Sequence, residues 1–363
     1  MHKYKILKKI IALFLFSALS ICGMTGCQKE TSDPADSQTK DAVTDLTDTV
    51  PVTDLPEITN AVVEDVKASF DAATGTLTIS GTGNMIDISG KDVNPLFEYQ
   101  ENTVKIIIEK GISGIGNYSF RKFSNLKSVS IPDGVTRIGC FAFAECENLS
   151  EISLPDTLKT IDYGAFQYCY ALPDINFPDS LRTIGDYAFI SCRSMKNITL
   201  NEGLTSIGGS AFTWCENLES IAIPDSVTSI GTGVLDNTKC NKVFIDNKNY
   251  VSDYWNDGVL YIGNHLIEVD TDKTGSFTVK EGTITIAGRA FNGCGNLTDV
   301  FIPNSVISIG EEAFQGCSSL KSITVPNKAS IGKFCFYFCS SLTEVRYADP
   351  SKPANLTIDD NND

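Results

Sequence analysis

A phenylalanine that recurs every 22 or 23 residues is the feature that most constrains the fold of this chain. An isoleucine stands five residues before each of these phenylalanines, and a leucine usually stands six residues after it. The consensus is L-x-x-I-x-I-P-x-x-V-T-x-I-G-x-x-A-F-x-x-C, and the series consists of Phe120, Phe143, Phe166, Phe189, Phe212, Phe291, Phe314 and Phe336. One unit of this length cannot bury its own apolar face, whereas stacked units can form one continuous core. The sequence therefore predicts a repeat solenoid.

Each unit divides into three short segments. The I-x-I alternation followed by proline predicts a short strand with one buried face and a fixed end. The V-T-x-I-G segment predicts a second extended piece that ends at a corner, where glycine is the natural residue. The A-F-x-x-C segment is too short for a stable helix of its own, but it can form a single turn around a buried phenylalanine.

The repeat resembles a known family of bacterial proteins. The stretches NLESIAIPDSVTSIGTGVL and SSLKSITVPNKASIGKFCFYFC resemble the 23-residue leucine-rich repeats of BspA-like surface proteins, and the resemblance covers about residues 66–347. It implies a mainly β solenoid with short turns, 3-10 or one-turn helices, and a parallel sheet on its concave face. The stretch ASFDAATGTLTISGTGNM resembles the N-terminal cap of these proteins, and its alternation suits a hairpin.

The repeat is interrupted once, between Leu235 and Phe291. Asn256-Asp257-Gly258 precedes the apolar run VLYI, and Gly263-Asn264 separates that run from LIEV, which predicts a β-hairpin and resembles the DGVLY variant unit of the family. We therefore expect a signal peptide (1–26), a flexible acidic and Thr-rich tether (27–65), an N-terminal β cap (66–103), a repeat array (104–235), a variant hairpin unit (236–285), a second array (286–347) and a polar C-terminal tail (348–363).

The N-terminal segment has the pattern of an export signal. Four lysines within residues 3–9 precede an apolar stretch, Ile10 to Cys22, that is too short for an ordinary transmembrane helix. Met24-Thr25-Gly26-Cys27 resembles a bacterial lipobox, which implies that Cys27 is lipidated and becomes the mature N-terminus. The alternative is ordinary secretion, with Cys27 incidental. Both predict an exported protein, and lipidation would hold it at the cell membrane and surface through its N-terminal lipid only.

Charge and motif content exclude several classes of function. The formal net charge is −16, and it becomes −20 without the signal peptide, because that segment holds four lysines and no acidic residue. Such a chain repels nucleic acid and anionic lipid. The sequence contains no G-x-S-x-G elbow, P-loop, dinucleotide fingerprint or H-E-x-x-H motif. His265, the only histidine after the signal peptide, is expected at a solvated hairpin turn. We expect no enzymatic activity and no cofactor.

Seven cysteines share one slot of the repeat, three residues after the phenylalanine. In an exported protein they could form a ladder of disulfides or hold a metal. The alternative is that the slot needs a small, buried, weakly polar residue. We favour packing because Phe123 fills the slot in the first unit. Cys140 and Cys335 lie off the ladder and could be exposed, and the ladder itself consists of Cys146, Cys169, Cys192, Cys215, Cys294, Cys317 and Cys339.

One segment matches the spacing of a calcium-binding loop. Asp270, Asp272, Thr274 and Gly275 are followed by Glu281 at the twelfth position. The flanking sequences, IEV and FTV, are typical of strands and not of the helices that border an EF-hand loop. We therefore expect a polar hairpin turn and no metal site.

Side chains that alternate with the buried ones on the I-x-I strands supply the candidate binding surface. They are small, polar and mildly acidic, and they comprise Ser128, Ser130, Glu151, Ser153, Asp174, Asn176, Asn197, Thr199, Ser220, Asp299, Phe301 and Thr324. Tyr168, Tyr187 and Trp214, on the turn side, are candidate aromatic anchors, although packing would account for part of them.

The family resemblance implies a surface protein that recognises an extracellular protein or glycan, in adhesion to host or neighbouring cells. A different class of function is an envelope scaffold with no extracellular ligand. A third is a hydrolase, which would require two carboxylates together in a concave pocket.

Overall fold

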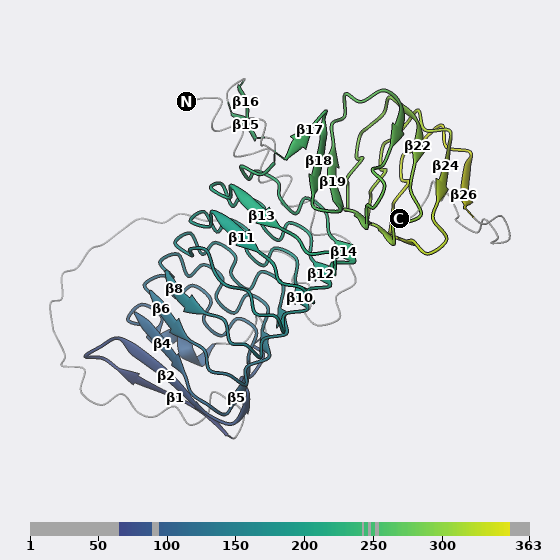
Figure 1. Ribbon diagram of the computed structural model, residues 1–363. Coiled ribbons are helices and arrows are strands. Elements are labelled where there is room, and N and C mark those ends of the chain that lie inside the picture. Colours follow the sequence, from purple (N-terminus) through teal and green to yellow (C-terminus); the bar gives the residue numbers. More distant parts are fainter. Residues whose placement is uncertain (1–64, 89–93, 242, 246–247, 251–253, 349–363) are drawn as a thin grey trace, which may run out of the picture. The chain divides into compact units, whose positions relative to one another are not determined.

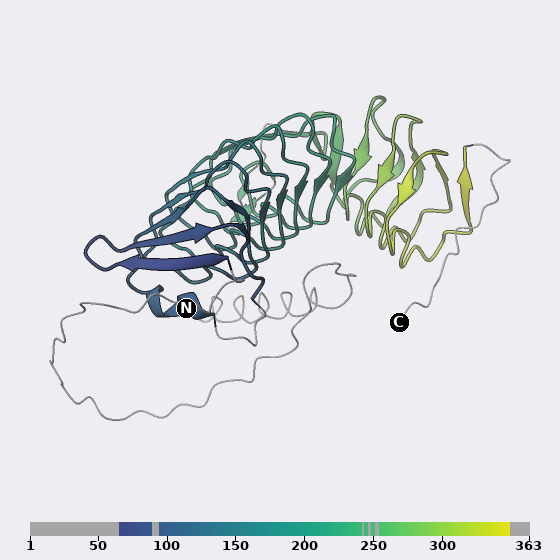
Figure 2. The same ribbon diagram turned by 90° about the horizontal axis from the view of Figure 1, so that it is seen from below.

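The computed structural model describes residues 65–88, 94–241, 243–245, 248–250 and 254–348, all within one compact unit. These residues form a β-solenoid of stacked coils, as the repeat predicts (Figures 1 and 2). The one helix within the described ranges is the 3-10 helix η1 (Pro95–Tyr99), which the side chain of Asn94 caps by accepting a hydrogen bond from Leu96 N. The A-F-x-x-C segments form turns instead of helices.

The I-x-I segments form strands that pair in parallel from coil to coil. As predicted for the cap, β1 (Val66–Asp71) and β2 (Thr76–Gly81) form an antiparallel hairpin. The sheet continues in parallel through β4 (Lys105–Ile108), β6 (Ser128–Ser130) and β8 (Glu151–Ser153). A second sheet consists of β11 (Asn197–Thr199) and β13 (Ser220–Ala222). A third consists of β20 (Gly275–Thr278), β22 (Leu297–Phe301), β24 (Ser322–Val325) and β26 (Glu344–Tyr347).

The V-T-x-I segments form a second series of strands, mostly two residues long. In the first array these are β5 (Ile112–Ile115), β7 (Arg137–Ile138), β9 (Thr160–Ile161), β10 (Thr183–Ile184), β12 (Ser206–Ile207) and β14 (Ser229–Ile230), and β3 (Gly83–Asn84) of the cap pairs with β5 at the start of this sheet. In the second they are β21 (Thr285–Ile286), β23 (Ser308–Ile309) and β25 (Ser330–Ile331).

The predicted hairpin lies between the two arrays. Strands β17 (Trp255–Asn256), β18 (Val259–Ile262) and β19 (His265–Val269) are antiparallel neighbours, and β19 then pairs in parallel with β21. A separate antiparallel pair precedes them, formed by β15 (Val243–Ile245) and β16 (Lys248–Tyr250). The second array is therefore built onto the last strand of the variant unit.

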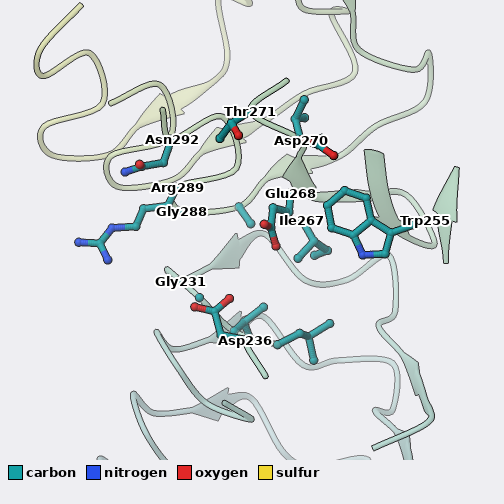
Figure 3. Close-up of a pocket in the computed structure, with 15 residues that line it drawn as sticks. Gly231, Asp236, Trp255, Ile267, Glu268, Asp270, Thr271, Gly288, Arg289 and Asn292 are labelled. Atoms are coloured by element: carbon teal, nitrogen blue, oxygen red, sulfur yellow. The ribbon is translucent and has the colours of Figure 1, made fainter. Parts of the chain in front are cut away.

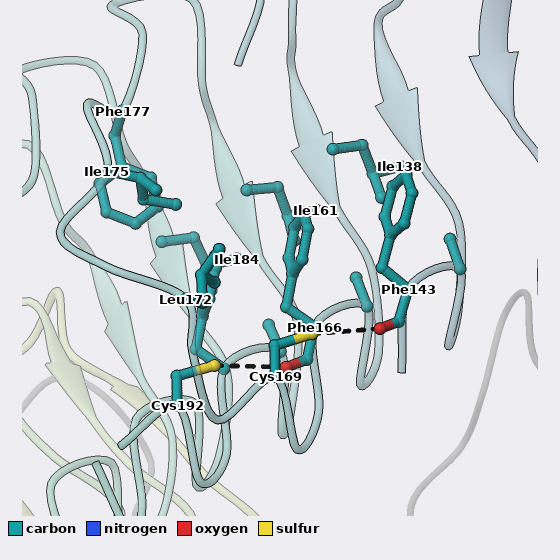
Figure 4. Close-up of a cluster of buried hydrophobic side chains, with 14 of the residues drawn as sticks. Ile138, Phe143, Ile161, Phe166, Cys169, Leu172, Ile175, Phe177, Ile184 and Cys192 are labelled. Atoms are coloured by element: carbon teal, nitrogen blue, oxygen red, sulfur yellow. Dashed lines mark hydrogen bonds between the residues drawn. The ribbon is translucent and has the colours of Figure 1, made fainter. Parts of the chain in front are cut away.

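The recurring phenylalanines form a stacked column in the core (Figure 4). From Phe120 to Phe212 successive ring centroids are 5.2 to 5.5 Å apart, and the rings from Phe143 to Phe212 lie within 8° of parallel. A second column runs from Phe291 through Phe314 to Phe336, with centroids 4.6 and 5.7 Å apart. Isoleucines and leucines of the same coils surround both columns. The period of the sequence is thus the length of one coil.

The ladder cysteines are buried thiols that bond to the preceding coil. Cys169 Sγ lies 3.1 Å from Phe143 O, and Cys192 Sγ lies 3.3 Å from Phe166 O (Figure 4). The same contact recurs for Cys146, Cys215, Cys317 and Cys339. Each thiol donates a weak hydrogen bond to a carbonyl oxygen that the turn leaves inside the core. The packing role that we predict for the slot is confirmed for these residues, which form no disulfide.

Each turn contains two residues with a left-handed backbone, two positions before and two positions after the phenylalanine. Tyr118 (φ 59°) and Lys122 (φ 66°) flank Phe120 in this way, although neither is a glycine. The geometry directs backbone donors toward the next coil: Phe120 N and Lys122 N each lie 2.8 Å from a carbonyl oxygen there, Ala142 O and Ala144 O. Hydrogen bonds between coils therefore hold a conformation that bulky residues rarely adopt.

The corner glycines are required because neighbouring coils approach closely, and not because the corner bends. A Cβ on Gly208 would lie 2.3 Å from Asp186 N, and one on Gly231 would lie 2.2 Å from Gly209 N. Neither glycine has a positive φ. The role that we predict for these residues is therefore corrected: they admit the backbone of the preceding coil.

Val269 takes the place of the missing phenylalanine where the repeat is interrupted. Its N–H donates to Ala290 O over 2.8 Å, and its carbonyl oxygen lies 3.7 Å from the thiol sulfur of Cys294. In regular coils phenylalanine makes both contacts. Gly288 N also donates to Ile230 O, so the second array is hydrogen-bonded to the first on one side of the interruption.

His265 is buried, with 0% of its surface exposed, so the predicted solvated position is wrong. It is the first residue of β19 and faces inward. Nδ1 lies 2.9 Å from Thr285 Oγ1, and Nε2 lies 3.1 Å from Pro224 O. Because Pro224 O can only accept, we assign the proton to Nε2, and Nδ1 accepts from the Thr285 hydroxyl. Burial lowers the pKa of His265, which agrees with this neutral form.

Candidate functional site

The candidate binding surface consists of the outward side chains of the I-x-I strands; we call this surface the strand face. Strand register places its residues in two rows. Ser128 lies beside Glu151 in one row, and Ser130 lies beside Ser153 in the other. The remaining neighbours, by register, are Asn197 with Ser220, Thr199 with Ala222, Asp299 with Ser322, and Phe301 with Thr324. The structure thus places ten of the twelve predicted residues on these strands, in pairs that belong to three separate sheets.

Asp174 interrupts the strand face, because the segment around it is not a strand. Pro173 has no N–H to donate to the preceding coil. On the other side, Asp174 Oδ1 takes the place of a backbone carbonyl oxygen and accepts from Lys196 N at 2.5 Å and Asn197 N at 2.9 Å. Burial raises the pKa of Asp174, but these hydrogen bonds outweigh it and lower the pKa overall. The Asp174 carboxylate is therefore occupied by hydrogen bonds within the solenoid. Asn176, which is exposed in the same segment, is the candidate ligand contact there.

Phe301 is the most prominent side chain of the strand face. It is 58% exposed, and its neighbours in register are Thr278 and Thr324, both exposed. In the adjacent row, Asp299 Oδ2 accepts from Thr298 Oγ1 at 2.8 Å. A phenyl ring surrounded by hydroxyl and carboxylate groups is the arrangement expected of a binding hot spot.

The three candidate aromatic anchors do not form one surface. Tyr168 and Trp214 occupy the position two residues after the phenylalanine of their coils, both with φ 61°. Tyr187 occupies the position two residues before it (φ 57°) and packs on Tyr163, with ring centroids 5.2 Å apart. It belongs to a row of contacting rings that also includes Tyr118 and Phe141. Tyr187 is therefore a packing residue, whereas Tyr168 and Trp214 remain candidates.

A pocket of about 380 Å³ lies beside the interruption of the repeat (Figure 3). One wall is the coil that contains Leu235 and Asp236, and the opposite wall contains Ile267 and Glu268 of β19. Trp255 and Arg289 also border it. Sequence reasoning missed this pocket because its walls come from segments about 30 residues apart. It does hold more than one carboxylate, as a hydrolase would require, but it lies away from the strand face.

Several other predicted features can be placed. Cys140 and Cys335 are each only 4% exposed, so the expectation that they could be exposed is wrong. Asp270 follows β19 and Gly275 begins β20, which confirms strand flanks for the calcium-like segment. In it, Asp270 Oδ1 accepts from Asp272 N at 3.1 Å, as in a tight turn. Among the described residues no group of three or more His, Cys, Asp or Glu could hold a metal ion.

The predicted signal peptide (1–26), the lipidation site Cys27, the tether up to residue 64 and the tail from residue 349 lie outside the described residues. In the part of the chain that is described, no helix has the length and apolar character needed to cross a membrane.

Solved structures of bacterial proteins resemble this chain. A leucine-rich repeat protein from Eubacterium ventriosum shares 26% identity over 79% of this chain and 71% of its own, with a TM-score of 0.47. One from Bacteroides ovatus shares 25% over 80% and 76%, with a TM-score of 0.40. A leucine rich cell surface protein from Faecalibacterium prausnitzii shares 23% over 82% and 96%, with a TM-score of 0.32. No curated protein matches the chain.

The 23-residue coils, the parallel strand ladders and the phenylalanine columns define a leucine-rich repeat solenoid. The sequence matches the BspA type leucine rich repeat region in six copies, over residues 93–193, 136–258 and 262–357. These matches cover more than half of the chain, and the protein therefore belongs to this family.

Proposed function

We propose that this protein is an exported binding protein whose strand face recognises an extracellular protein or glycan. The observation that carries the proposal is Phe301, a large apolar side chain 58% exposed within rows of small polar residues. An exposed phenyl ring on a regular strand does not contribute to the packed core of the solenoid, whereas a partner surface can bury it. Its neighbours supply hydroxyl and carboxylate groups for a polar rim.

The charge pattern around Phe301 suits a partner surface better than a deep ligand site. Arg346 lies one strand beyond Thr324 in the same row and pairs with Glu344, and Asp299 lies in the adjacent row. Acidic and basic groups on both sides of an apolar centre are typical of recognition surfaces. A scaffold role would not require this arrangement.

Binding is expected to depend on Phe301 and not on exposed phenylalanine in general. The chain, immobilised on beads, is screened against extracellular matrix proteins and glycans, and captured ligands are titrated by surface plasmon resonance. We expect Phe301→Ala to weaken binding at least tenfold, the range of a hot-spot residue. Phe338→Ala is the matched control, because Phe338 is 65% exposed but lies in the turn of the last coil. Equal losses for both variants, or capture of envelope components of the producing cell only, would favour the scaffold.

We further propose that Cys27 carries the lipid that holds the protein at the cell surface. The proposal is supported by Met24-Thr25-Gly26-Cys27 after an apolar stretch, and by an acidic, Thr-rich segment that would separate lipid and solenoid. Expressed in a bacterium fed radiolabelled palmitate, the protein is expected to take up label and sediment with membranes. Cys27→Ala should abolish labelling and release the protein, whereas Cys22→Ala should change neither. Label retained in Cys27→Ala would overturn the assignment.

A further inference from the structure

The pocket at the interruption of the repeat is lined by carboxylates, one guanidinium and an indole ring, and its wall contains a backbone donor that is unpaired within the described ranges. In regular coils the N–H of the phenylalanine position donates to the next coil, as Phe212 N does to Val234 O at 3.1 Å. Leu235 occupies that position in the last coil before the interruption, and its N–H has no acceptor among the residues that the structure describes. Leu235 is 0% exposed, so this donor is buried in the pocket wall and is not itself a ligand contact.

The acceptors come from carboxylates on opposite walls. In Figure 3 the side chain of Asp236 extends from the lower wall and that of Glu268 from the wall above it. Glu268 Oε2 accepts from Asn241 Nδ2 at 2.8 Å, whereas the Asp236 carboxylate has no hydrogen-bond donor within the described ranges. Asp236 reaches solvent, so an entering ligand can meet it directly.

The remaining walls are aromatic and apolar. Trp255 is half-buried at one side, and the buried residues Ile267 and Ala287 also line the cavity. Arg289 stands at the other side, where its guanidinium pairs with Glu312. A pocket of this volume with apolar walls and a few convergent polar groups has the dimensions of a ligand site.

The charged, polar and aromatic groups that line the pocket restrict the class of ligand that it can bind. An anion would meet Asp236 and Glu268, and an organic cation would meet the guanidinium of Arg289, so either would leave a repulsive contact inside the pocket. A neutral polyhydroxylated ligand can donate to the carboxylates and accept from the Arg289 guanidinium at the same time. Its C–H face can pack on the indole of Trp255.

We propose that this pocket binds one sugar unit of a glycan. The site is separate from the strand face, so the inference goes beyond the proposed function and does not depend on it: a chain that binds a protein through Phe301 need not bind sugar, and the converse also holds. The sugar is held by hydroxyl donation to Asp236 and Glu268, by donation from the guanidinium of Arg289, and by contact with Trp255.

The test is titration of the whole protein with the methyl β-glycosides of glucose, galactose and N-acetylglucosamine. Binding is followed by saturation-transfer NMR and calorimetry. We expect at least one glycoside to saturate with a millimolar Kd, unchanged between 50 and 500 mM NaCl because the ligand is uncharged. Spermidine and inorganic phosphate are titrated in parallel as a cation and an anion.

Two variants locate the binding. Asp236→Asn keeps the shape of an exposed side chain while removing its charge, and Trp255→Ala removes the aromatic wall; each is expected to weaken binding at least tenfold. Phe338→Ala, remote from the pocket, should bind as the unaltered protein does. Because Asp236 is exposed, its variant keeps the test valid if Trp255→Ala fails to fold.

Three results would overturn the proposal. The first is absence of saturation by all three glycosides, and the second is salt-sensitive binding of spermidine or phosphate that Asp236→Asn alters. The third is sugar binding that both pocket variants retain. Release of methanol from a glycoside in the NMR sample would also overturn it, because the pocket would then be the active site of a hydrolase that uses the two carboxylates.

Discussion

Replacing Phe166 by alanine is expected to lower the free energy of unfolding by about 3 to 5 kcal/mol, the usual cost of truncating a buried phenylalanine. Phe166 is fully buried, and its ring stacks within 8° of parallel on both Phe143 and Phe189. The cavity would therefore open in the middle of the column, where neither adjacent coil can collapse into it without losing its own hydrogen bonds. Urea unfolding followed by circular dichroism measures the loss.

The stacked arrangement also predicts where the effect spreads. Each coil contacts only its neighbours, so hydrogen exchange is expected to accelerate most in the coils of Phe143 and Phe189 and least near Phe314. Phe301→Ala, on the exposed strand face, is the control and should change the unfolding free energy by no more than about 0.5 kcal/mol. A loss below about 1 kcal/mol for Phe166→Ala, or a uniform rise in exchange, would contradict the column as the main stabilising element.

The core was predictable because its signal repeats. Phe143 and Phe166 occupy equivalent places in successive coils, so one period of the sequence shows which side chains stack. The interruption was predictable for the same reason, and Gly263-Asn264 identifies the turn between β18 and β19. The features that depend on a single position were harder to infer. His265 stands next to that turn in the sequence, yet as the first residue of β19 it faces the core.

The structural features that the sequence did not predict depend on contacts between neighbouring coils. Tyr168 and Trp214 have backbone angles that their residue types disfavour, and no local signal indicates this, because hydrogen bonds to the next coil impose the conformation. Val269 replaces a phenylalanine without any motif. Pro173 did carry a usable signal, because a proline at the start of an I-x-I strand removes a ladder donor and so predicts a break there. Nothing in the sequence indicates that Asp174 accepts the hydrogen bonds of the following coil.

The free energy of unfolding is expected to fall steeply above pH 9, because buried thiols cannot ionise in the folded chain. Burial raises the pKa of seven of these thiols above the ordinary value, to about 12 for Cys215, Cys240 and Cys294; the other four are Cys146, Cys169, Cys192 and Cys335. In the unfolded chain the same groups lose their protons near about pH 8.5. Between these values the unfolded state binds fewer protons than the folded state, so stability decreases as pH rises.

The size of this effect follows from the number of thiols. Each contributes about 1.4 kcal/mol per pH unit over that range, and seven together contribute on the order of 10 kcal/mol per pH unit. A total stability of about 5 to 15 kcal/mol would be lost within one to two pH units. We therefore expect cooperative unfolding between about pH 9.5 and 11, accompanied by rapid alkylation of thiols that react slowly with iodoacetamide at pH 8.

The slope of stability against pH separates the thiols from other titrating groups. Tyrosines also titrate in this range, and burial raises the pKa of Tyr163 and Tyr187. A triple variant with alanine at Cys146, Cys169 and Cys192 should release about three fewer protons on unfolding, whatever its stability at pH 7. An unchanged slope in that variant would assign the pH dependence to tyrosine. A chain that remains folded and unreactive at pH 11.5 would show that the thiols do not contribute to alkaline unfolding.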